Sequence, residues 1–227
     1  KTGYTRPHTV HCMPGGIVTL SMLGSATGDG PGGFAVLDST TFEVKGRWEN
    51  GGPHPPFNYD FWYQPRHNVM VSSELGAPKT YQGGFDLADV GKGLYGQRLH
   101  FWDWQGRSLA QSFDLGADGL VPLEVRFLHD PDSTHGYVGA ALSSNLWHWH
   151  KPNGRWELSK VIDMPPVEVE GWPFPVPPLT TDLLVALDDR FLYLSNWLHG
   201  DVRQYEISDP VSPRLTGQLY LGGVLGK

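Results

Sequence analysis

One short stretch near the start of the chain concentrates the side chains that bind transition metals and take part in redox chemistry. Residues 6–12 read Arg-Pro-His-Thr-Val-His-Cys, so two imidazoles and the chain's one thiol fall within five residues. Imidazole and thiolate are common ligands of copper and zinc, and a thiol can also be oxidised. A Pro-Gly-Gly sequence at 14–16 and the apolar run 17–20 follow, which predicts a strand, a tight turn and a second strand.

The composition predicts a protein built from short strands and many turns. The 227 residues include 29 Gly, 19 Pro and 9 Trp, and no helical period extends over a convincing length. A net charge of −7 argues against nucleic acid or an anionic membrane as the main partner. No apolar run approaches the ~18 residues that a membrane span needs. A single Cys excludes an internal disulfide but leaves the compartment open.

Four units with the same order of strands, turns and loops follow one another along the chain. They are about 50 residues apart, as expected for four-stranded propeller blades. The sequence therefore predicts an all-β fold, a single partial β-propeller domain over residues 1–227. A β-sandwich is the alternative, and the regular spacing favours the propeller. The segments 76–96 and 165–178 are predicted loops. Because the chain opens at Lys1 without an initiator Met and stops just after a strand-like run, we expect a fragment of a larger propeller. The four expected blades cover residues 6–50, 57–115, 120–164 and 179–223.

Propeller geometry predicts that side chains far apart in the sequence meet at one mouth of the central channel. The start of a blade's first strand lies at the same face as the loop between its second and third strands. This places His8 and His11 near His199, and three imidazoles around an open position would suit copper or zinc. Glu74 and Asp182 are expected at the same mouth, where they could orient the imidazoles or transfer protons. Carboxylates at the starts of first strands, such as Asp182, could instead cap channel waters and backbone N–H groups.

Other reactive side chains have weaker patterns. Cys12 is either a reactive thiol or a small buried residue, and its position directly after a ligand candidate on a strand favours the structural role. His148 and His150 alternate with Trp on a predicted strand, which favours a solvated strand face over a metal site. A serine hydrolase is not predicted because the Gly-x-Ser-x-Gly elbow is missing. The His residues that fall in or beside loops and turns receive no role, namely His54, His67, His100, His129 and His135.

Several long motifs resemble those of the selenium-binding proteins, also called methanethiol oxidases. The resemblance spans nearly the whole chain in order, and the long motifs, of which 187–205 is the longest, are specific. The motifs are Arg-Pro-His-Thr-Val-His-Cys at 6–12, Tyr-Asp-Phe-Trp-Tyr-Gln-Pro-Arg-His-Asn at 59–68, Trp-Asp-Trp at 102–104, Pro-Leu-Glu-Val-Arg-Phe-Leu-His at 122–129, Ser-Asn-Trp-Leu-His-Gly-Asp at 195–201 and Pro-Arg-Leu-Thr-Gly-Gln at 213–218.

The resemblance implies a seven-bladed propeller of about twice this length. It also implies copper-dependent oxidation of methanethiol by dioxygen to formaldehyde, hydrogen sulfide and hydrogen peroxide. His8, His11 and His199 occupy matching motifs, so the resemblance implies that they bind the copper. The family's N-terminal segment with His and Cys and its C-terminal Tyr-Pro-Gly-Gly-Asp motif are absent here, so Cys12 need not inherit a selenium-binding role. The alternative function is a non-catalytic propeller that binds selenium or a thiol and acts as a protein-interaction module.

Overall fold

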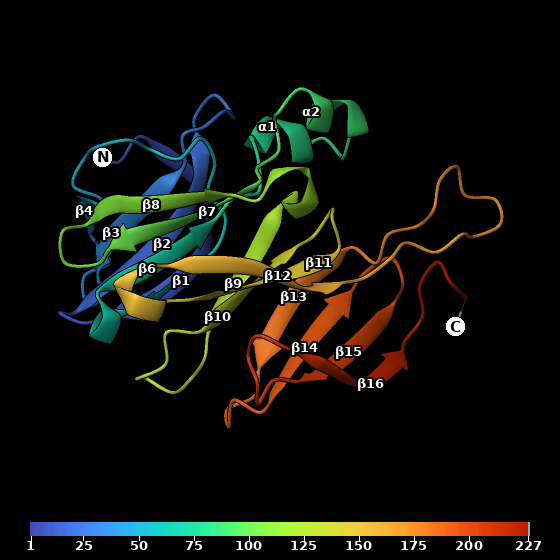
Figure 1. The fold of residues 1–227 in the computed structure, drawn as a ribbon. Helices are drawn as coiled ribbons and strands as arrows, with labels where there is room; N and C mark the ends of the chain where they lie inside the picture. Colours follow the sequence, from blue (N-terminus) through green and yellow to red (C-terminus); the bar gives the residue numbers. More distant parts are fainter. Residues whose placement is uncertain (227) are drawn as a thin grey trace. The chain divides into compact units, whose positions relative to one another are not determined.

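The computed structural model describes residues 1–226 as four antiparallel sheets of four strands each (Figure 1). In every sheet the strands are hydrogen-bonded in their sequence order, as in a propeller blade. The predicted all-β class with four blades is therefore confirmed. The first sheet holds β1 (Tyr4–Met13), β2 (Ile17–Ser25), β3 (Gly33–Asp38) and β4 (Val44–Arg47), and the second holds β5 (Phe61–Gln64), β6 (Val69–Ser73), β7 (Arg98–Asp103) and β8 (Ser108–Asp114). The third holds β9 (Pro122–Phe127), β10 (Gly136–Ala140), β11 (Asn145–His150) and β12 (Glu157–Asp163), and the fourth holds β13 (Thr180–Val185), β14 (Phe191–Asn196), β15 (Asp201–Glu206) and β16 (Arg214–Tyr220).

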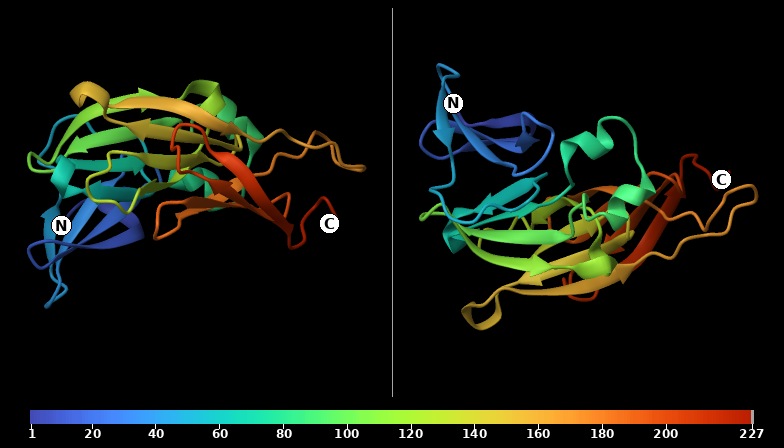
Figure 2. Two further views of the ribbon diagram at one scale, coloured as in Figure 1. Left: turned by 60° about the horizontal axis from the view of Figure 1, so that its bottom comes forward. Right: turned by 90° about the horizontal axis from the view of Figure 1, so that it is seen from above.

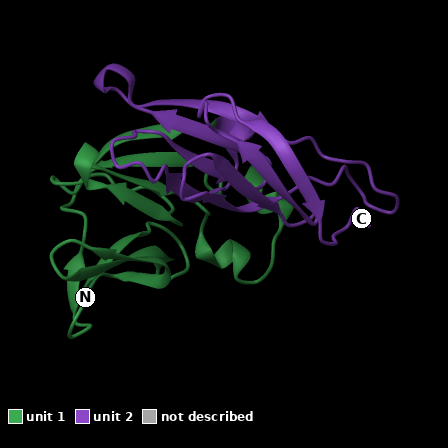
Figure 3. Cartoon of the chain, turned by 90° about the horizontal axis from the view of Figure 1, so that it is seen from below, with its two compact units in different colours: residues 1–115 green, residues 116–227 purple. Residues whose placement is uncertain are grey.

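The chain divides into two compact units of two sheets each, residues 1–115 and residues 116–227 (Figure 3). The prediction of a single domain over the whole chain stays a prediction.

Each unit has its own hydrophobic core between its two sheets. In the first unit Phe34 and Trp48 pack edge-on against Trp102, with ring centroids 5.5 and 6.1 Å apart. In the second unit Tyr137 and Leu192 belong to one buried cluster that joins the third and fourth sheets. Edge-to-face aromatic pairs and buried aliphatic side chains each stabilise such a core by about 0.5–3 kcal/mol.

The segment 76–96 differs from the predicted loop because it contains two short helices, α1 (Pro78–Tyr81) and α2 (Leu87–Gly91). Proline at the first helical position of α1 needs no hydrogen-bond acceptor. The Asp86 side chain caps α2 by accepting a hydrogen bond from Ala88 N. Three short 3-10 turns, η1 (Pro65–His67), η2 (Gly116–Gly119) and η3 (Pro152–Gly154), complete the helical structure of residues 1–226.

The segment 165–178 lies between β12 and β13 and forms no strand, which confirms the predicted loop. It extends away from the sheets of its own unit (Figures 1 and 2). A single bridge between Val167 and Val176 closes it at the base. Within residues 1–226, none of the helices has the length and the apolar composition to span a bilayer.

Candidate functional site

The strand that carries the opening His residues begins earlier than predicted. β1 starts at Tyr4 rather than at His8, so His8 lies in its middle and His11 lies near the turn into β2. Neither residue is at the start of the strand, which corrects the placement that the sequence suggested. A bulge interrupts the ladder between Pro7 and Val10. Because one extra residue flips the alternation of side chains, two residues three apart can face the same side.

The His8 imidazole is oriented by a short relay to a buried carboxylate. Its Nδ1 lies 3.1 Å from Thr9 Oγ1, and that hydroxyl donates to Asp60 Oδ1 at 2.6 Å. Since the hydroxyl proton goes to Asp60, the His8 ring donates its Nδ1–H and keeps a lone pair on Nε2. Partial burial lowers the pKa of His8, with the Asp60 carboxylate opposing the shift. The ring also packs on Tyr59, with centroids 4.0 Å apart.

His11 is oriented by a backbone carbonyl. Its Nε2 lies 2.9 Å from Phe61 O, and a carbonyl can only accept, so Nε2 carries the proton and Nδ1 carries the lone pair. The ring stands edge-on to Phe61 and Trp62 at 4.8 and 4.7 Å. His8 therefore contacts Tyr59, just before β5, and His11 contacts the first residues of β5. Contacts with one segment are expected if the bulge turns both side chains to the same side.

His199 follows β14 in the second unit and is oriented in the same way as His11. Its Nε2 donates to Val176 O at 2.9 Å, so the lone pair resides on Nδ1. The side chain is buried, with 2% of its surface exposed. It lines a cavity of about 480 Å³ together with Arg203, Gln218, Tyr220, Leu225 and the first part of the loop 165–178, from Pro165 to Glu170. A buried imidazole of fixed tautomer beside a cavity is suited to bind a metal ion.

Glu74 is buried, and both oxygens of its carboxylate are hydrogen-bonded. Oε2 accepts hydrogen bonds from the backbone N–H groups of Gln97 and Arg98, both at 3.2 Å, and Oε1 lies 2.9 Å from His100 Nε2. The Glu74 carboxylate therefore caps backbone N–H groups, a role that the sequence suggested only for carboxylates at the starts of first strands. The contact with His100 adds a partner that could carry a proton.

His100 is a residue that sequence reasoning missed. The sequence groups it with the His residues in or beside loops and turns, whereas it lies on β7 with 1% of its surface exposed and contacts Glu74. Its Nδ1 lies 2.8 Å from Ser112 Oγ on β8. The available signal was its place between apolar residues on a predicted strand, where an imidazole needs hydrogen-bond partners.

Asp182 lies on β13 and is exposed. Its Oδ1 accepts a hydrogen bond from Leu183 N at 2.8 Å. This contact matches the capping alternative, and a proton-transfer role for Asp182 stays a prediction.

Two expectations about the other reactive side chains are wrong. Cys12 is exposed rather than a small buried residue. His148 has no exposed surface and its Nε2 lies 2.8 Å from His135 Nδ1, so the strand face that carries it is not solvated. His148 and His150 do share one face of β11, as predicted, but the rings of His135 and of Tyr137 on the neighbouring strand pack against His148 on that face.

The structure brings His8 and His11 together on one strand of the first unit and places His199 in the second unit. The meeting of all three imidazoles stays a prediction. Among residues 1–226, no group of three or more His, Cys, Asp or Glu side chains is arranged to hold a metal ion. The donor set nevertheless fits copper chemically, because each of the three rings has one nitrogen fixed by an oxygen and a lone pair on the other.

Comparison with known proteins gives the family. A family model described as 56kDa selenium binding protein (SBP56) matches residues 1–227. The methanethiol oxidase of Danio rerio is 56% identical over 225 residues, which cover 98% of this chain and 49% of that protein. The methanethiol oxidase of Homo sapiens is 57% identical over 222 residues, covering 97% and 47%. The chain thus spans about half the length of the curated relatives it matches.

Solved structures give the same result for the fold. The X-ray structure of a hypothetical selenium-binding protein from Sulfolobus tokodaii is similar with a TM-score of 0.93 and 43% identity, covering 98% of this chain and 51% of that one. The β-propeller domain of Cps50 (Swd1) from Myceliophteria thermophila is similar in fold alone, with a TM-score of 0.63 at 10% identity over 99% of this chain and 57% of that one. The blades are therefore those of a β-propeller, and the chain belongs to the 56-kDa selenium-binding protein family.

Proposed function

We propose that this chain is part of a methanethiol oxidase, which oxidises methanethiol with dioxygen and water to formaldehyde, hydrogen sulfide and hydrogen peroxide at a His-bound copper. The observation that carries the proposal is the 56–57% identity, over nearly all of the chain, to relatives that bear this name. The oriented imidazoles of His8, His11 and His199 support it, because they offer the nitrogen donors that copper binds.

The chain's own residues would act as ligands and as proton carriers. His8 would bind the metal through Nε2, and His11 and His199 through Nδ1. Copper, when bound, would supply a soft site for the thiolate and a route for electrons to dioxygen. The thiol must lose a proton when it binds, and the peroxide must gain protons, so a carboxylate within reach would assist both steps. Glu74 is our first candidate for that role because it already contacts His100, and Asp182 is our second.

A non-catalytic module is the second candidate function. The matching family model is described as a selenium-binding protein rather than as an oxidase. In this alternative the same propeller face holds selenium or a thiol without turnover and docks a protein partner.

His199→Ala in the full-length, copper-supplied protein tests the proposal. We expect the copper content to fall by at least half and the rate of methanethiol consumption to fall by about 100-fold or more. Loss of a hydrogen-bond partner of a metal ligand lowers metal affinity or activity by 10–100-fold, and loss of the ligand itself costs more. His129→Ala is the matched control, since His129 Nε2 also bonds a backbone carbonyl, Val185 O, at 3.1 Å but lies after β9. Unchanged copper and unchanged rate in His199→Ala would contradict the ligand assignment. Bound selenium or thiol without turnover in the wild-type protein would favour the module.

A further inference from the structure

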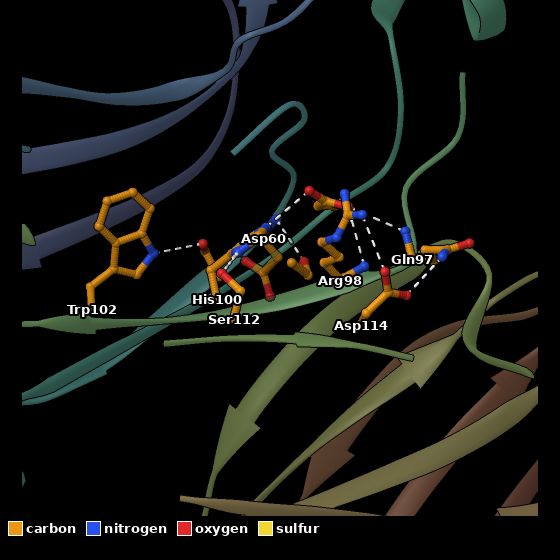
Figure 4. Close-up of polar contacts among 10 residues, drawn as sticks. Asp60, Gln97, Arg98, His100, Trp102, Ser112 and Asp114 are labelled. Carbon is orange, nitrogen blue, oxygen red and sulfur yellow. Dashed lines mark hydrogen bonds and ion pairs between the residues drawn. The ribbon is translucent and has the colours of Figure 1, made fainter. Parts of the chain in front are cut away.

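A row of hydrogen bonds crosses the second sheet from a buried carboxylate to an exposed hydroxyl. Ser72, His100 and Ser112 are paired across β6, β7 and β8, so their side chains share one face of the sheet. Glu74 comes two residues after Ser72 and projects on the same side. The resulting distances are 2.9 Å from Glu74 Oε1 to His100 Nε2 and 2.8 Å from His100 Nδ1 to Ser112 Oγ. Figure 4 shows the His100 and Ser112 side chains next to each other on neighbouring strands.

The two ends of this row differ in their access to water. Glu74 and His100 each expose 1% of their surface, whereas Ser112 lies on the outermost strand of the sheet and is exposed. Asp114 lies on the same face of β8, two residues farther on, and is also exposed; it pairs with Arg98 at 3.1 Å. The hydrogen bonds described for residues 1–226 connect the Glu74 carboxylate to this exposed hydroxyl through the His100 ring.

Each link can pass a proton. With His100 neutral, its Nε2–H donates to Glu74 and its Nδ1 accepts from the Ser112 hydroxyl. If Ser112 takes a proton from water as it passes its own to Nδ1, and the ring gives its Nε2 proton to the ionised Glu74, one proton moves inward and His100 ends neutral with its proton on Nδ1. Imidazole is the side chain best suited to this exchange because its two nitrogens can gain and lose protons near neutral pH.

We propose that His100 and Ser112 form the path by which Glu74 exchanges protons with solvent during methanethiol oxidation. This inference rests on the proposed function and adds two residues to it. Glu74 is the group that transfers protons, and His100 and Ser112 recharge it. Neither of the two touches the substrate in this account.

His100→Gln in the full-length protein tests the path without removing its hydrogen bonds. A glutamine amide can donate to Glu74 and accept from Ser112, but it cannot pass a proton on. We expect copper content and melting temperature close to wild type, and a turnover lower by about 100-fold in weak buffer, the low end of what a positioned proton carrier contributes. A rate that does not fall, or one that falls only together with copper content or melting temperature, would overturn the path.

Proton exchange in the resting protein gives a second test that needs neither copper nor turnover. In ¹⁵N-histidine-labelled protein the His100 Nε2–H should exchange with solvent quickly for a group so buried, and Ser112→Ala should slow that exchange about tenfold or more. Ser72→Ala is the matched control, because the Ser72 hydroxyl also bonds a ring nitrogen, Trp102 Nε1 at 2.9 Å, but lies outside the row from Glu74 to Ser112. Equal exchange in the wild type and in Ser112→Ala would overturn the path. A wild-type protein with no methanethiol turnover but with Ser112-dependent exchange would show that the proposed function fails while the path stands.

Discussion

Two groups of histidines in this chain show how differently imidazoles can be used. On β1, His8 and His11 each bond to an oxygen, a hydroxyl in one case and a backbone carbonyl in the other. At β10 and β11, the rings of His135, His148 and His150 lie 5.0–5.3 Å apart, and His135 and His148 bond to each other at 2.8 Å. The rings of the second group lie close to one another, whereas each ring of the first group is oriented by an oxygen, as expected of a metal ligand.

The difference shows that the orientation of a ring matters more than the proximity of rings. An oxygen acceptor fixes the tautomer and leaves a lone pair on the other nitrogen, which is the arrangement found behind metal-bound His. When two rings hydrogen-bond to each other, a lone pair of one ring accepts the N–H of the other, and that lone pair is then not available to a metal. Burial lowers the pKa of His148 to about 3, with His135 and His150 adding to the shift, so His148 stays uncharged near neutral pH.

The largest expected effect separates the two groups directly. In the full-length protein, His11→Ala should lower methanethiol turnover by about 100-fold or more and reduce bound copper, because a ligand is lost. His150→Ala should leave both unchanged. Metal analysis and substrate consumption measure the two outcomes. Loss of copper in His150→Ala with none in His11→Ala would reverse the comparison.

A smaller effect should follow from disturbing the relay behind His8. Thr9→Val removes the hydroxyl that links His8 to Asp60 and should weaken copper binding by about 10-fold, because outer contacts of metal ligands are worth 10–100-fold. Thr5→Val is the control on the same strand, since its hydroxyl bonds only the backbone oxygens of Gly24 and Ser25 among its acceptors. Copper competition titrations compare the variants, and equal affinities for all three proteins would remove Asp60 from the account.

The smallest effect concerns the stability of the second group in acid. A folded-state pKa of about 3 lies below the ordinary His value of 6.5, so below pH 6.5 the unfolded chain binds a proton that folded His148 does not. The free energy of unfolding should therefore fall by up to about 1.4 kcal/mol for each pH unit from 6.5 towards 3. His148→Gln should lose this contribution, whereas His129→Gln should keep it. Denaturant titrations at several pH values would contradict the assignment if wild type and His148→Gln had the same slope.

The blades could be predicted because their signals are local. Most strands are short and are either apolar or alternating, and several end at an aspartate, as β3 does at Asp38, β7 at Asp103 and β12 at Asp163. The start of β1 could not, because Pro7 lacks the N–H that a ladder needs and Arg6 has a positive φ of 62°. The bulge that accommodates this segment begins at Pro7, a residue type that sheets tolerate at bulges, but the sequence does not show on which side the bulge places His8 and His11.

The contacts of the candidate site were less accessible to sequence reasoning. Glu74 was identified by its place after a strand, but its contact with His100 depends on the register between β6 and β7, which the segment 76–96 separates. The burial of His148 depends on the side chains that cover its face, and period alone cannot show those. Tautomers are set by partners such as Phe61 O and Val176 O, which are backbone atoms that every residue carries.

Pulsed electron paramagnetic resonance of the Cu(II)-loaded full-length protein would test the central claim most directly, because it detects the imidazole nitrogens that bind the metal. The account predicts that His8→Ala, His11→Ala and His199→Ala each remove one imidazole from the wild-type spectrum, while His150→Ala removes none. A spectrum that is the same in wild type and in all three ligand variants would contradict it.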